Sequence, residues 1–271
     1  MKFLAIKIIR VTNRFLFKGV VIGLFFTFPK MICAQEKETF LDEVQGTLSV
    51  THNGIALVPS FSLGEPALLV DLKFRKGKFS FEPDMRFALE GKPWSMLFWF
   101  RYRAIEKKRF SLRTGIHPAL NFRTVPVIRN GATEHILESR RYLAGELVPN
   151  YKISDKVNVG MYYLHGRGFD EGVKQVNFLV LNATFSEMRL SEKLQLAFTP
   201  QVYYLTSDND KGYYTAGFLT LSKKKFPLSL TGIVNKAFAT EIAPEDDFIW
   251  TVLLNYKILC ASRKMMRLIE N

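Results

Sequence analysis

Apolar and polar side chains alternate along Lys78–Trp94, the stretch KFSFEPDMRFALEGKPW. Odd positions from 79 to 89 hold Phe, Phe, Pro, Met, Phe and Leu, whereas even positions from 78 to 90 hold Lys, Ser, Glu, Asp, Arg, Ala and Glu. Successive side chains point to opposite faces in an extended strand, whereas a helix groups them with a period near 3.6. The stretch therefore predicts a β-strand with one apolar and one polar face.

The same period of two recurs between turn signals along most of the chain. It predicts twelve strands near 53–63, 66–75, 78–90, 94–104, 109–124, 136–153, 157–167, 173–186, 194–206, 211–223, 226–239 and 247–257. No helical periodicity interrupts them and no linker divides them. Two strands do not alternate cleanly, because VNFLVLNATF is apolar on both faces and YYTAGFLTL nearly so.

The connections between the predicted strands alternate in type. The connections RKGK, IEKKR, SDK, RLSEK and KKK are short, and each contains Lys. The others are longer on average and more acidic: LGEP, EGKP, VIRNGATEH, RGFDEG, SDNDKG and TEIAPEDD. Outer-membrane barrels combine short periplasmic turns with longer outer loops. The alternation thus predicts an even number of antiparallel strands with both chain ends on one side.

Residues 1–34 have the features of a cleaved signal peptide. Basic residues without any acid precede the apolar run GVVIGLFFTF, which is too short for a membrane helix of ~20 residues. Cleavage after Ala34 removes six of the 38 Lys and Arg and no acid, so the formal charge falls from +13 to +7. We expect 35–50 to form a periplasmic leader, 51–257 the barrel, and 258–271 a basic periplasmic tail.

The apolar rows indicate a membrane. Aromatic residues make up 14% of the chain, although no long apolar run follows Gln35. Large aromatics near strand ends suit the two lipid interfaces: Trp94, Tyr102, Tyr163, Tyr204 and Trp250. Strands in lipid must close, because an unpaired edge leaves polar backbone in hydrocarbon. We therefore expect an all-β, antiparallel up-and-down transmembrane β-barrel of about 12 strands in the outer membrane. A soluble exported β-barrel binding protein is the alternative fold reading.

The polar rows would then line an enclosed lumen. The candidate lumen-lining residues are Glu82, Asp84, Arg86, Glu90, Arg101, Arg103, Arg113, His117, Asn121, Arg123 and Glu146. Such a charged Arg/Glu interior is typical of a pore or transport barrel, in which a surplus of Arg favours anions. Ion pairs that merely brace the walls are the competing interpretation.

The sequence resembles the small outer-membrane β-barrel proteins of Bacteroidota. The resemblance lies in CAQ, HNGIALVPSFSLG, FEPDMRFALEGKPWS, GIHPALNFR and FIWTVLLNY, and it covers most of the chain after the signal peptide. It implies compartment and architecture, and it carries no assigned activity. The partners expected of such a barrel are outer-membrane lipid, the barrel-assembly machinery and an envelope protein.

Other function classes have less support. A lipid-modifying enzyme would need a nucleophile beside a base such as His165, but YYLHGRGFD supplies none and no G-x-S-x-G elbow occurs. The four His and two Cys show no metal-ligand spacing, so we expect no metal and no cofactor. An exported chain without a basic helical face is also a poor nucleic-acid binder. We therefore expect no enzymatic activity.

Overall fold

The computed structural model describes residues 40–129, 131–243 and 247–260, and the compact unit Leu41–Leu259 contains the barrel except for Cys260, the last residue of its last strand. The predicted signal peptide 1–34 and residues 35–39 of the predicted leader lie outside the described residues, as do residues 261–271 of the predicted tail. Within the described ranges, no helix has the length and apolar character needed to cross a membrane.

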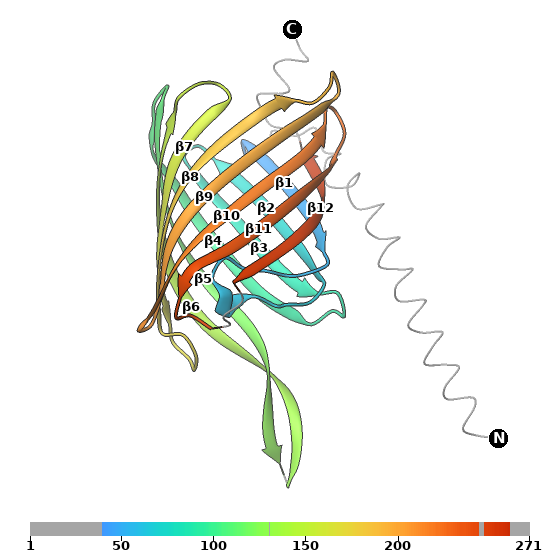
Figure 1. The fold of residues 1–271 in the computed structure, drawn as a ribbon, viewed down its shortest axis with the longest axis vertical. Coiled ribbons are helices and arrows are strands. Elements are labelled where there is room, and N and C mark those ends of the chain that lie inside the picture. The colour runs from blue at the N-terminus through green and yellow to red at the C-terminus, as the bar shows by residue number, and fades with distance from the viewer. Residues whose placement is uncertain (1–39, 130, 244–246, 261–271) are drawn as a thin grey trace, which may run out of the picture. The chain divides into compact units, whose positions relative to one another are not determined.

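In this part of the chain, twelve antiparallel strands close into one barrel, each paired with its neighbours in chain order (Figure 1). The strands are β1 (Glu43–Thr51), β2 (Ala67–Lys76), β3 (Phe79–Ala88), β4 (Pro93–Glu106), β5 (Phe110–Arg129), β6 (Ala132–Lys152), β7 (Val157–Gly168), β8 (Gln175–Arg189), β9 (Leu194–Ser207), β10 (Asp210–Lys223), β11 (Leu228–Thr240) and β12 (Phe248–Cys260). This confirms the predicted up-and-down antiparallel barrel. The last strand runs to Cys260, so the first residues of the predicted tail belong to the wall.

The first strand is not where the sequence pattern placed it. Strand β1 covers Glu43–Thr51, within the predicted leader, and the predicted strand 53–63 is instead a loop containing the 3-10 helix η1 (Pro59–Phe61). Residues 43–51 do alternate, with Ser49 3% exposed and Val50 43% exposed. The inward side chains of Thr47, Ser49 and Thr51 are small and uncharged, so the pattern is faint there, although Glu43 on the same face pairs with Lys73 and Arg75.

The seam between β1 and β12 closes the barrel. Ser49 Oγ donates to Asn255 Oδ1 at 2.8 Å, and the hydroxyls of Thr51 and Thr251 lie 2.5 Å apart. Thr51 Oγ1 also donates to the backbone carbonyl of Val252 at 3.0 Å. Closure leaves neither β1 nor β12 with a free row of backbone groups, which is the condition for a sheet to stand in lipid.

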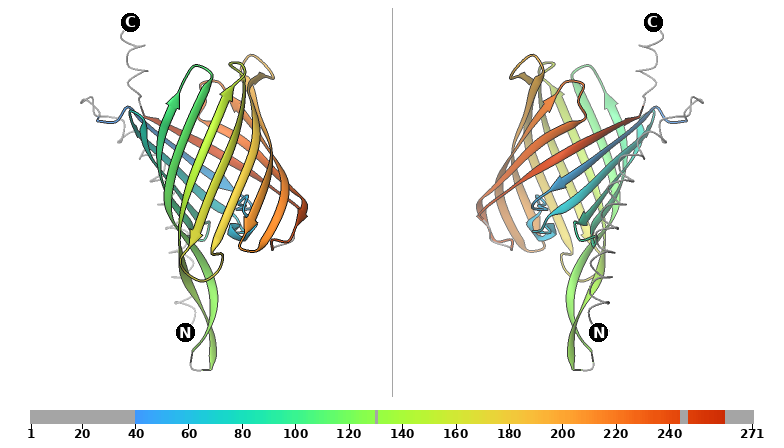
Figure 2. Two further views of the ribbon diagram at one scale, coloured as in Figure 1. Left: turned by 90° about the vertical axis from the view of Figure 1, so that its left-hand side faces the viewer. Right: turned by 90° about the vertical axis from the view of Figure 1, so that its right-hand side faces the viewer.

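The connections differ in length at the two ends of the barrel. At the end where β1 starts and β12 finishes, the turns are residues 77–78, 107–109, 153–156, 190–193 and 224–227. At the opposite end, which we call the loop end, two expected loops are extended strand instead. Strands β5 and β6 continue past the barrel rim as a long hairpin (Figure 1, Figure 2), and only residues 208–209 separate β9 from β10. Ladder hydrogen bonds therefore run through segments that their polar composition marked as loops.

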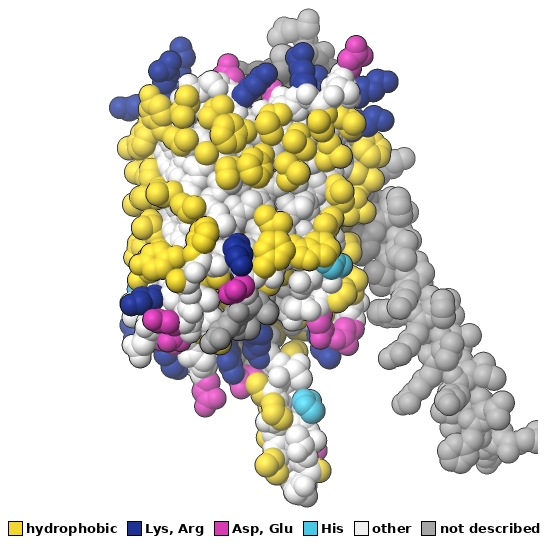
Figure 3. Space-filling view, in the orientation of Figure 1, with side chains coloured by type: hydrophobic (Ala, Val, Ile, Leu, Met, Phe, Trp, Pro, Cys, Tyr) yellow, Lys and Arg dark blue, Asp and Glu magenta, His cyan; other side chains and the backbone are white. Residues whose placement is uncertain are grey.

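The outward rows of the barrel are apolar. Leu181 is 55% exposed whereas Val180 beside it is 3% exposed, and the same contrast separates Leu254 at 51% from the inward-facing Thr251 at 2%. Figure 3 shows hydrophobic side chains over the visible wall, with Lys, Arg, Asp and Glu concentrated at its two ends. An exposed apolar surface of this extent marks contact with something other than water.

Candidate functional site

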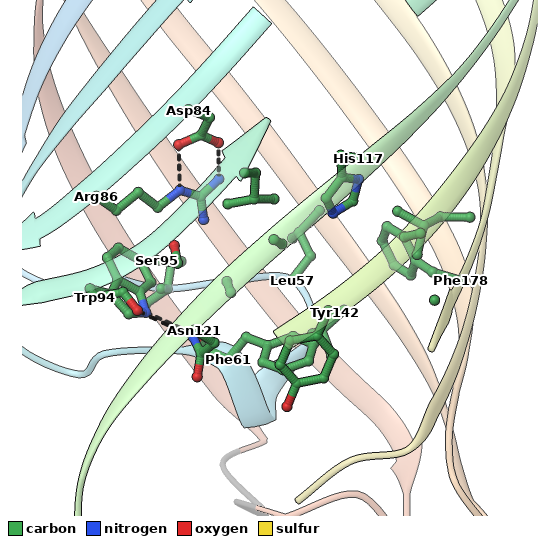
Figure 4. Close-up of a pocket in the computed structure, with 18 of the residues that line it drawn as sticks. Leu57, Phe61, Asp84, Arg86, Trp94, Ser95, His117, Asn121, Tyr142 and Phe178 are labelled. Carbon is green, nitrogen blue, oxygen red and sulfur yellow. Dashed lines mark hydrogen bonds and ion pairs between the residues drawn. The ribbon is translucent and has the colours of Figure 1, made fainter. Parts of the chain in front are cut away.

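The connection between β1 and β2 folds into the barrel. We call residues 52–66 the plug segment. Its side chains Leu57, Val58 and Phe61 pack against the buried apolar cluster of the wall, and Figure 4 shows Leu57 and Phe61 inside the barrel among wall residues. The segment holds its own shape through Gly54, whose N–H donates to Glu65 O at 2.8 Å. The ends of the plug segment therefore lie side by side.

Three wall side chains hold the plug segment by its backbone carbonyls. Trp94 Nε1 donates to Phe61 O at 2.8 Å, and the Tyr203 hydroxyl donates to Leu57 O at 3.1 Å. The Arg123 guanidinium donates to the carbonyl of Ser60 and, at 3.3 Å, to that of Ser62. Two of these donors come from the neighbouring strands β4 and β5 and the third from the distant strand β9, and each satisfies a carbonyl that would otherwise lie unpaired in the lumen.

A cavity of about 500 Å³ lies between the plug segment and the wall. This volume falls within the range of small-molecule sites. Figure 4 shows Arg86 at the left of the cavity, His117 and Phe178 at the right, and Phe61 and Tyr142 below. Strands β3 to β5 supply the polar lining residues Asp84, Arg86, Arg101 and His117, and strands β8 to β11 supply apolar ones such as Phe178.

Ion pairs on β3 to β6 support the polar side of the cavity, which their member Arg101 lines. Arg101 lies between two carboxylates, bonding Glu82 through Nη1 and Glu146 through Nε at 2.8 Å. Arg113 Nε reaches the same Glu146 Oε1 at 3.0 Å, and the Glu146 side chain is fully buried. A buried carboxylate is tolerated only when it is paired and hydrogen-bonded, and here two guanidinium groups meet that condition. We call these four residues the ionic wall.

A second ion pair borders the cavity nearby. Arg86 donates to Asp84 through Nε at 2.8 Å and through Nη2 at 2.5 Å. This is the bidentate geometry that suits guanidinium and carboxylate. Its Nη1 makes no hydrogen bond to any described residue, and Figure 4 shows the guanidinium directed toward the cavity. The pair thus supplies a polar face with little net charge.

His117 lies beside the ionic wall in an aromatic setting. Its ring centroid is 3.8 Å from that of Trp99, and the Arg101 guanidinium carbon lies 4.2 Å from the Trp99 ring. Among the described residues, His117 Nδ1 is a buried polar atom without a hydrogen-bond partner. An unpaired buried nitrogen is costly, so a molecule in the cavity that hydrogen-bonds His117 would remove that cost and bind more tightly.

The opposite side of the cavity, on β8 to β11, is apolar and aromatic. Val176 and Phe178 line it, and they belong to a buried cluster that also contains Val180, Tyr203, Leu205, Tyr214, Ala216, Ala237 and Ile242. Tyr203 and Tyr214 stack with centroids 4.8 Å apart, and Phe178 meets Tyr203 edge-on at 5.0 Å. This explains the two strands that resisted assignment, because β8 and β10 have apolar side chains toward the lumen as well as outward.

Most predicted lumen residues face the interior. The structure places Glu82, Asp84, Arg86, Arg101, Arg113, His117, Asn121, Arg123 and Glu146 there, in ion pairs, on the cavity or on the plug segment. Glu90 does not belong to this set, because β3 ends at Ala88 and the exposed Glu90 pairs with Lys92 in the following turn at 3.5 Å. Arg103 lies near the turn end of β4 and pairs with Glu106 at 3.0 Å.

One of the five predicted interface aromatics is wrong. Trp94 is 1% exposed and points into the barrel, because the register of β3 and β4 shifts between Arg86 and Phe87. The shift pairs Phe87 with Pro93 and leaves Trp94 bulged, so that Trp94 and Ser95 both border the cavity. Tyr163 is 37% exposed and Trp250 51% exposed on the outside. The remaining two contact outward aromatics, with Tyr102 against Phe79 and Tyr204 against Tyr213.

Sequence reasoning missed the plug segment and the apolar side of the lumen. The turn signals Asn53-Gly54 and Pro59 argued against a strand at 53–63, and they were the available clue. The two-sided apolar character of VNFLVLNATF and YYTAGFLTL was the clue to the apolar side.

The structure offers little for an enzyme at His165. This residue is exposed on the outer wall, where its Nδ1 lies 2.9 Å from Asn177 Oδ1. No described Ser, Thr or Cys hydrogen-bonds its ring. Within the described ranges, no group of three or more His, Cys, Asp or Glu residues is placed to hold a metal ion.

Known proteins resemble this chain in structure but not in sequence. No protein-family profile matches this chain, and no curated protein matches it in sequence. Among solved structures it is similar to the KdgM porin in complex with disordered oligogalacturonate, with TM-score 0.48 and 10% identity over 79% of this chain and 98% of that one. An outer membrane channel from Pseudomonas putida F1 has TM-score 0.48 and 12% identity over 83% of this chain and 97% of that one. LpxR from Salmonella typhimurium has TM-score 0.40 and 11% identity over 79% and 99%. Likeness at this level concerns barrel architecture alone.

Proposed function

We propose that this chain is an outer-membrane β-barrel channel for small amphipathic solutes, with a lumen narrowed by the plug segment. The observation that carries the proposal is the cavity of about 500 Å³ inside a closed barrel, polar on one side and aromatic on the other. A filled barrel would have no such space, and a wide water-filled pore would not have a buried aromatic side.

The membrane location follows from the outer surface. The outward rows of β8 to β12 contain large apolar side chains that water would not favour in such number: Leu179, Leu181, Val202, Leu219, Leu230, Val234, Phe238 and Leu254. Ring closure at the seam pairs every strand, as a hydrocarbon environment requires. Lipid is thus the first partner in this proposal, and the barrel-assembly machinery is the second.

The solute class follows from the two sides of the cavity. Arg101 of the ionic wall and the Asp84–Arg86 pair present polar atoms to the cavity, and their charges are largely neutralised by their ion-pair partners. The facing cluster around Phe178 presents rings and aliphatic groups. A molecule with a hydroxyl-rich or zwitterionic end and a short apolar end satisfies both sides, whereas a simple ion or a sugar contacts only one.

The plug segment is the element that admits or excludes such a solute. It is held to the wall by hydrogen bonds from Trp94, Tyr203 and Arg123, and its apolar side chains pack on the same cluster that a solute would touch. A solute that competes for this cluster would displace Leu57 and Phe61 from the wall, because the same apolar surface cannot contact both.

Planar-bilayer conductance and liposome swelling test the proposal. The comparison is between wild type and a variant with residues 55–63 replaced by Gly-Ser-Gly, which the adjacent Gly54 and Glu65 allow. We expect small conductance steps in wild type and larger steps in the variant. Swelling should be faster with an n-butyl glycoside than with a pentose of lower mass. The channel would be refuted if wild type and the variant both fold and neither protein gives conductance or swelling.

Two finer statements belong to this proposal. The first is kinship with small outer-membrane barrels of Bacteroidota, which rests on the sequence resemblance. The second is that the barrel lacks enzymatic activity, which is supported by the surroundings of His165. Phospholipid turnover by the purified barrel that disappears in His165→Ala would contradict the second.

A further inference from the structure

The outer wall has a polar row where lipid contact predicts apolar side chains. Strand register aligns four residues across β7, β8, β9 and β10: His165 opposite Asn177, Asn177 opposite Thr206, and Thr206 opposite Lys211. These positions face outward, since the residues flanking them in sequence, such as Val176 and Leu205, are buried in the interior. We call this set the polar row.

A second row lies next to the polar row on the membrane side. Its members are Tyr163, Leu179, Tyr204 and Tyr213, which are also aligned by register. Each lies two positions from the polar-row residue on the same strand, which is about 7 Å along that strand. Tyrosines concentrate at the boundary between hydrocarbon and headgroups. The polar row, one step nearer the loop end, therefore lies at headgroup depth.

The polar row is held in place by hydrogen bonds. Asn177 Oδ1 accepts from the Tyr163 hydroxyl at 3.1 Å and from His165 Nδ1 at 2.9 Å. Asn177 Nδ2 donates to Thr206 Oγ1 at 3.0 Å. Because the amide oxygen only accepts, His165 carries a proton on Nδ1. Side chains locked in this way bind a ligand without a large loss of rotamer entropy.

Two basic side chains border the row without a partner of their own. Lys211 ends the row on β10, and Arg167 lies two residues beyond His165 on β7; both are exposed, and neither makes an ion pair with a described residue. Two acids of the neighbouring loops are already engaged, whereas Glu241, whose N–H donates to Lys211 O at 2.9 Å, makes no ion pair with a described residue. Asp170 pairs with Arg141 at 2.7 Å, and Asp208 Oδ1 accepts the backbone N–H groups of Lys174 and Gln175.

We propose that the polar row, with Arg167 and Lys211, binds the phosphate of a membrane lipid in the leaflet at the loop end. The acyl chains would lie over Leu179 and the tyrosines of the adjacent row. The inference rests on the proposed membrane location, and it adds a lipid site that channel activity does not require. Charge complementarity selects the phosphate, and the apolar row directly beneath it selects a lipid over a soluble anion.

Native mass spectrometry of the protein purified from membranes, kept in detergent, tests the site. The probes are phosphatidic acid and diacylglycerol with the same acyl chains, so that they differ only in the phosphate. We expect phosphatidic acid to bind and diacylglycerol not to bind. The double variant Arg167→Gln/Lys211→Gln should bind phosphatidic acid about tenfold more weakly. Lys223→Gln, at the opposite end of β10, is the matched control and should bind as wild type does.

Three results would overturn the lipid site. These are equal binding of the two lipids, unchanged binding by the double variant, and inorganic phosphate that competes as effectively as the lipid. Conductance of the same preparations separates this proposal from the proposed function. A double variant that conducts normally yet loses phosphatidic acid supports both, and lipid binding by a barrel that never conducts supports the lipid site alone.

Discussion

Trp94 Nε1 and the backbone carbonyl of Phe61 are joined by a hydrogen bond of 2.8 Å, which ties the wall strand β4 to the plug segment. The indole reaches the carbonyl because a register shift bulges Trp94 into the lumen. A bulge that re-aims a side chain in this way is a common device next to functional sites. The plug segment is therefore held by a specific donor as well as by apolar packing.

Removing this donor should loosen the plug segment. Trp94→Phe keeps an aromatic ring but deletes the N–H, which leaves the Phe61 carbonyl unpaired at a cost of about 1–3 kcal/mol. We expect the variant to show larger or more frequent conductance steps in planar bilayers. We also expect it to unfold at a lower urea concentration than wild type does. The outward-facing Trp250→Phe serves as the control and should leave conductance unchanged. Equal conductance in all three proteins would contradict the role of Trp94.

The ionic wall should be sensitive to its buried carboxylate. Glu146→Gln leaves Arg101 and Arg113 without their shared partner, and breaking a buried pair by removing one member costs about 3–5 kcal/mol. Urea unfolding followed by tryptophan fluorescence measures this loss. The matched variant Glu90→Gln removes a carboxylate from an exposed pair with Lys92 and should cost at most about 1 kcal/mol. Equal losses in the two variants would show that the wall does not depend on ion pairing.

The loop between β7 and β8 is held by an ion pair between Asp170 and Arg141 that should weaken in acid. The Arg141 side chain and backbone N–H bond Asp170, and they lower the pKa of its carboxyl to about 2. A lowered folded pKa stabilises the loop above the unfolded value of about 3.9, and that stabilisation is lost as pH falls toward 2. Carboxyl ¹³C shifts in micelles should give a midpoint near 2 in wild type. In Arg141→Gln the titration midpoint of Asp170 should move toward the unfolded value. An unchanged midpoint would show that a group other than Arg141 lowers this pKa.

The assignment of β1 can be tested by deletion. Removing residues 43–51 should prevent the folded, heat-modifiable form on a gel, because β2 and β12 would keep unpaired edges in lipid. The control deletion removes residues 125–136 from the β5–β6 hairpin, which extends beyond the rim (Figure 2), and should leave the barrel folded. Normal heat-modifiability after the first deletion would show that the barrel closes without this strand.

Alternation predicted the fold because lipid imposes one rule on every outward position. Leu219 and Leu254 obey that rule, and so do Leu179 and Leu181 on β8, whereas the polar row departs from it. Nothing imposes a comparable rule on the lumen. Inward positions hold the charged Glu146 on one side of the lumen and the apolar Phe178 on the other. The alternation of polar and apolar residues therefore located the ionic wall but not the apolar side. A one-residue bulge inverts parity locally, which is why Trp94 was assigned to the wrong face.

Spin-label accessibility along β10 tests the central claim most directly, because it reads which face touches hydrocarbon. Nitroxides placed singly from 213 to 221, in a background with both native cysteines replaced by Ser, are measured in liposomes with oxygen and with a water-soluble nickel chelate as relaxing agents. We expect oxygen to dominate at 213, 215, 217, 219 and 221 and to fall at 214, 216, 218 and 220. Nickel access equal to that of an exposed loop at the odd positions would contradict the account, because the apolar rows would then face water.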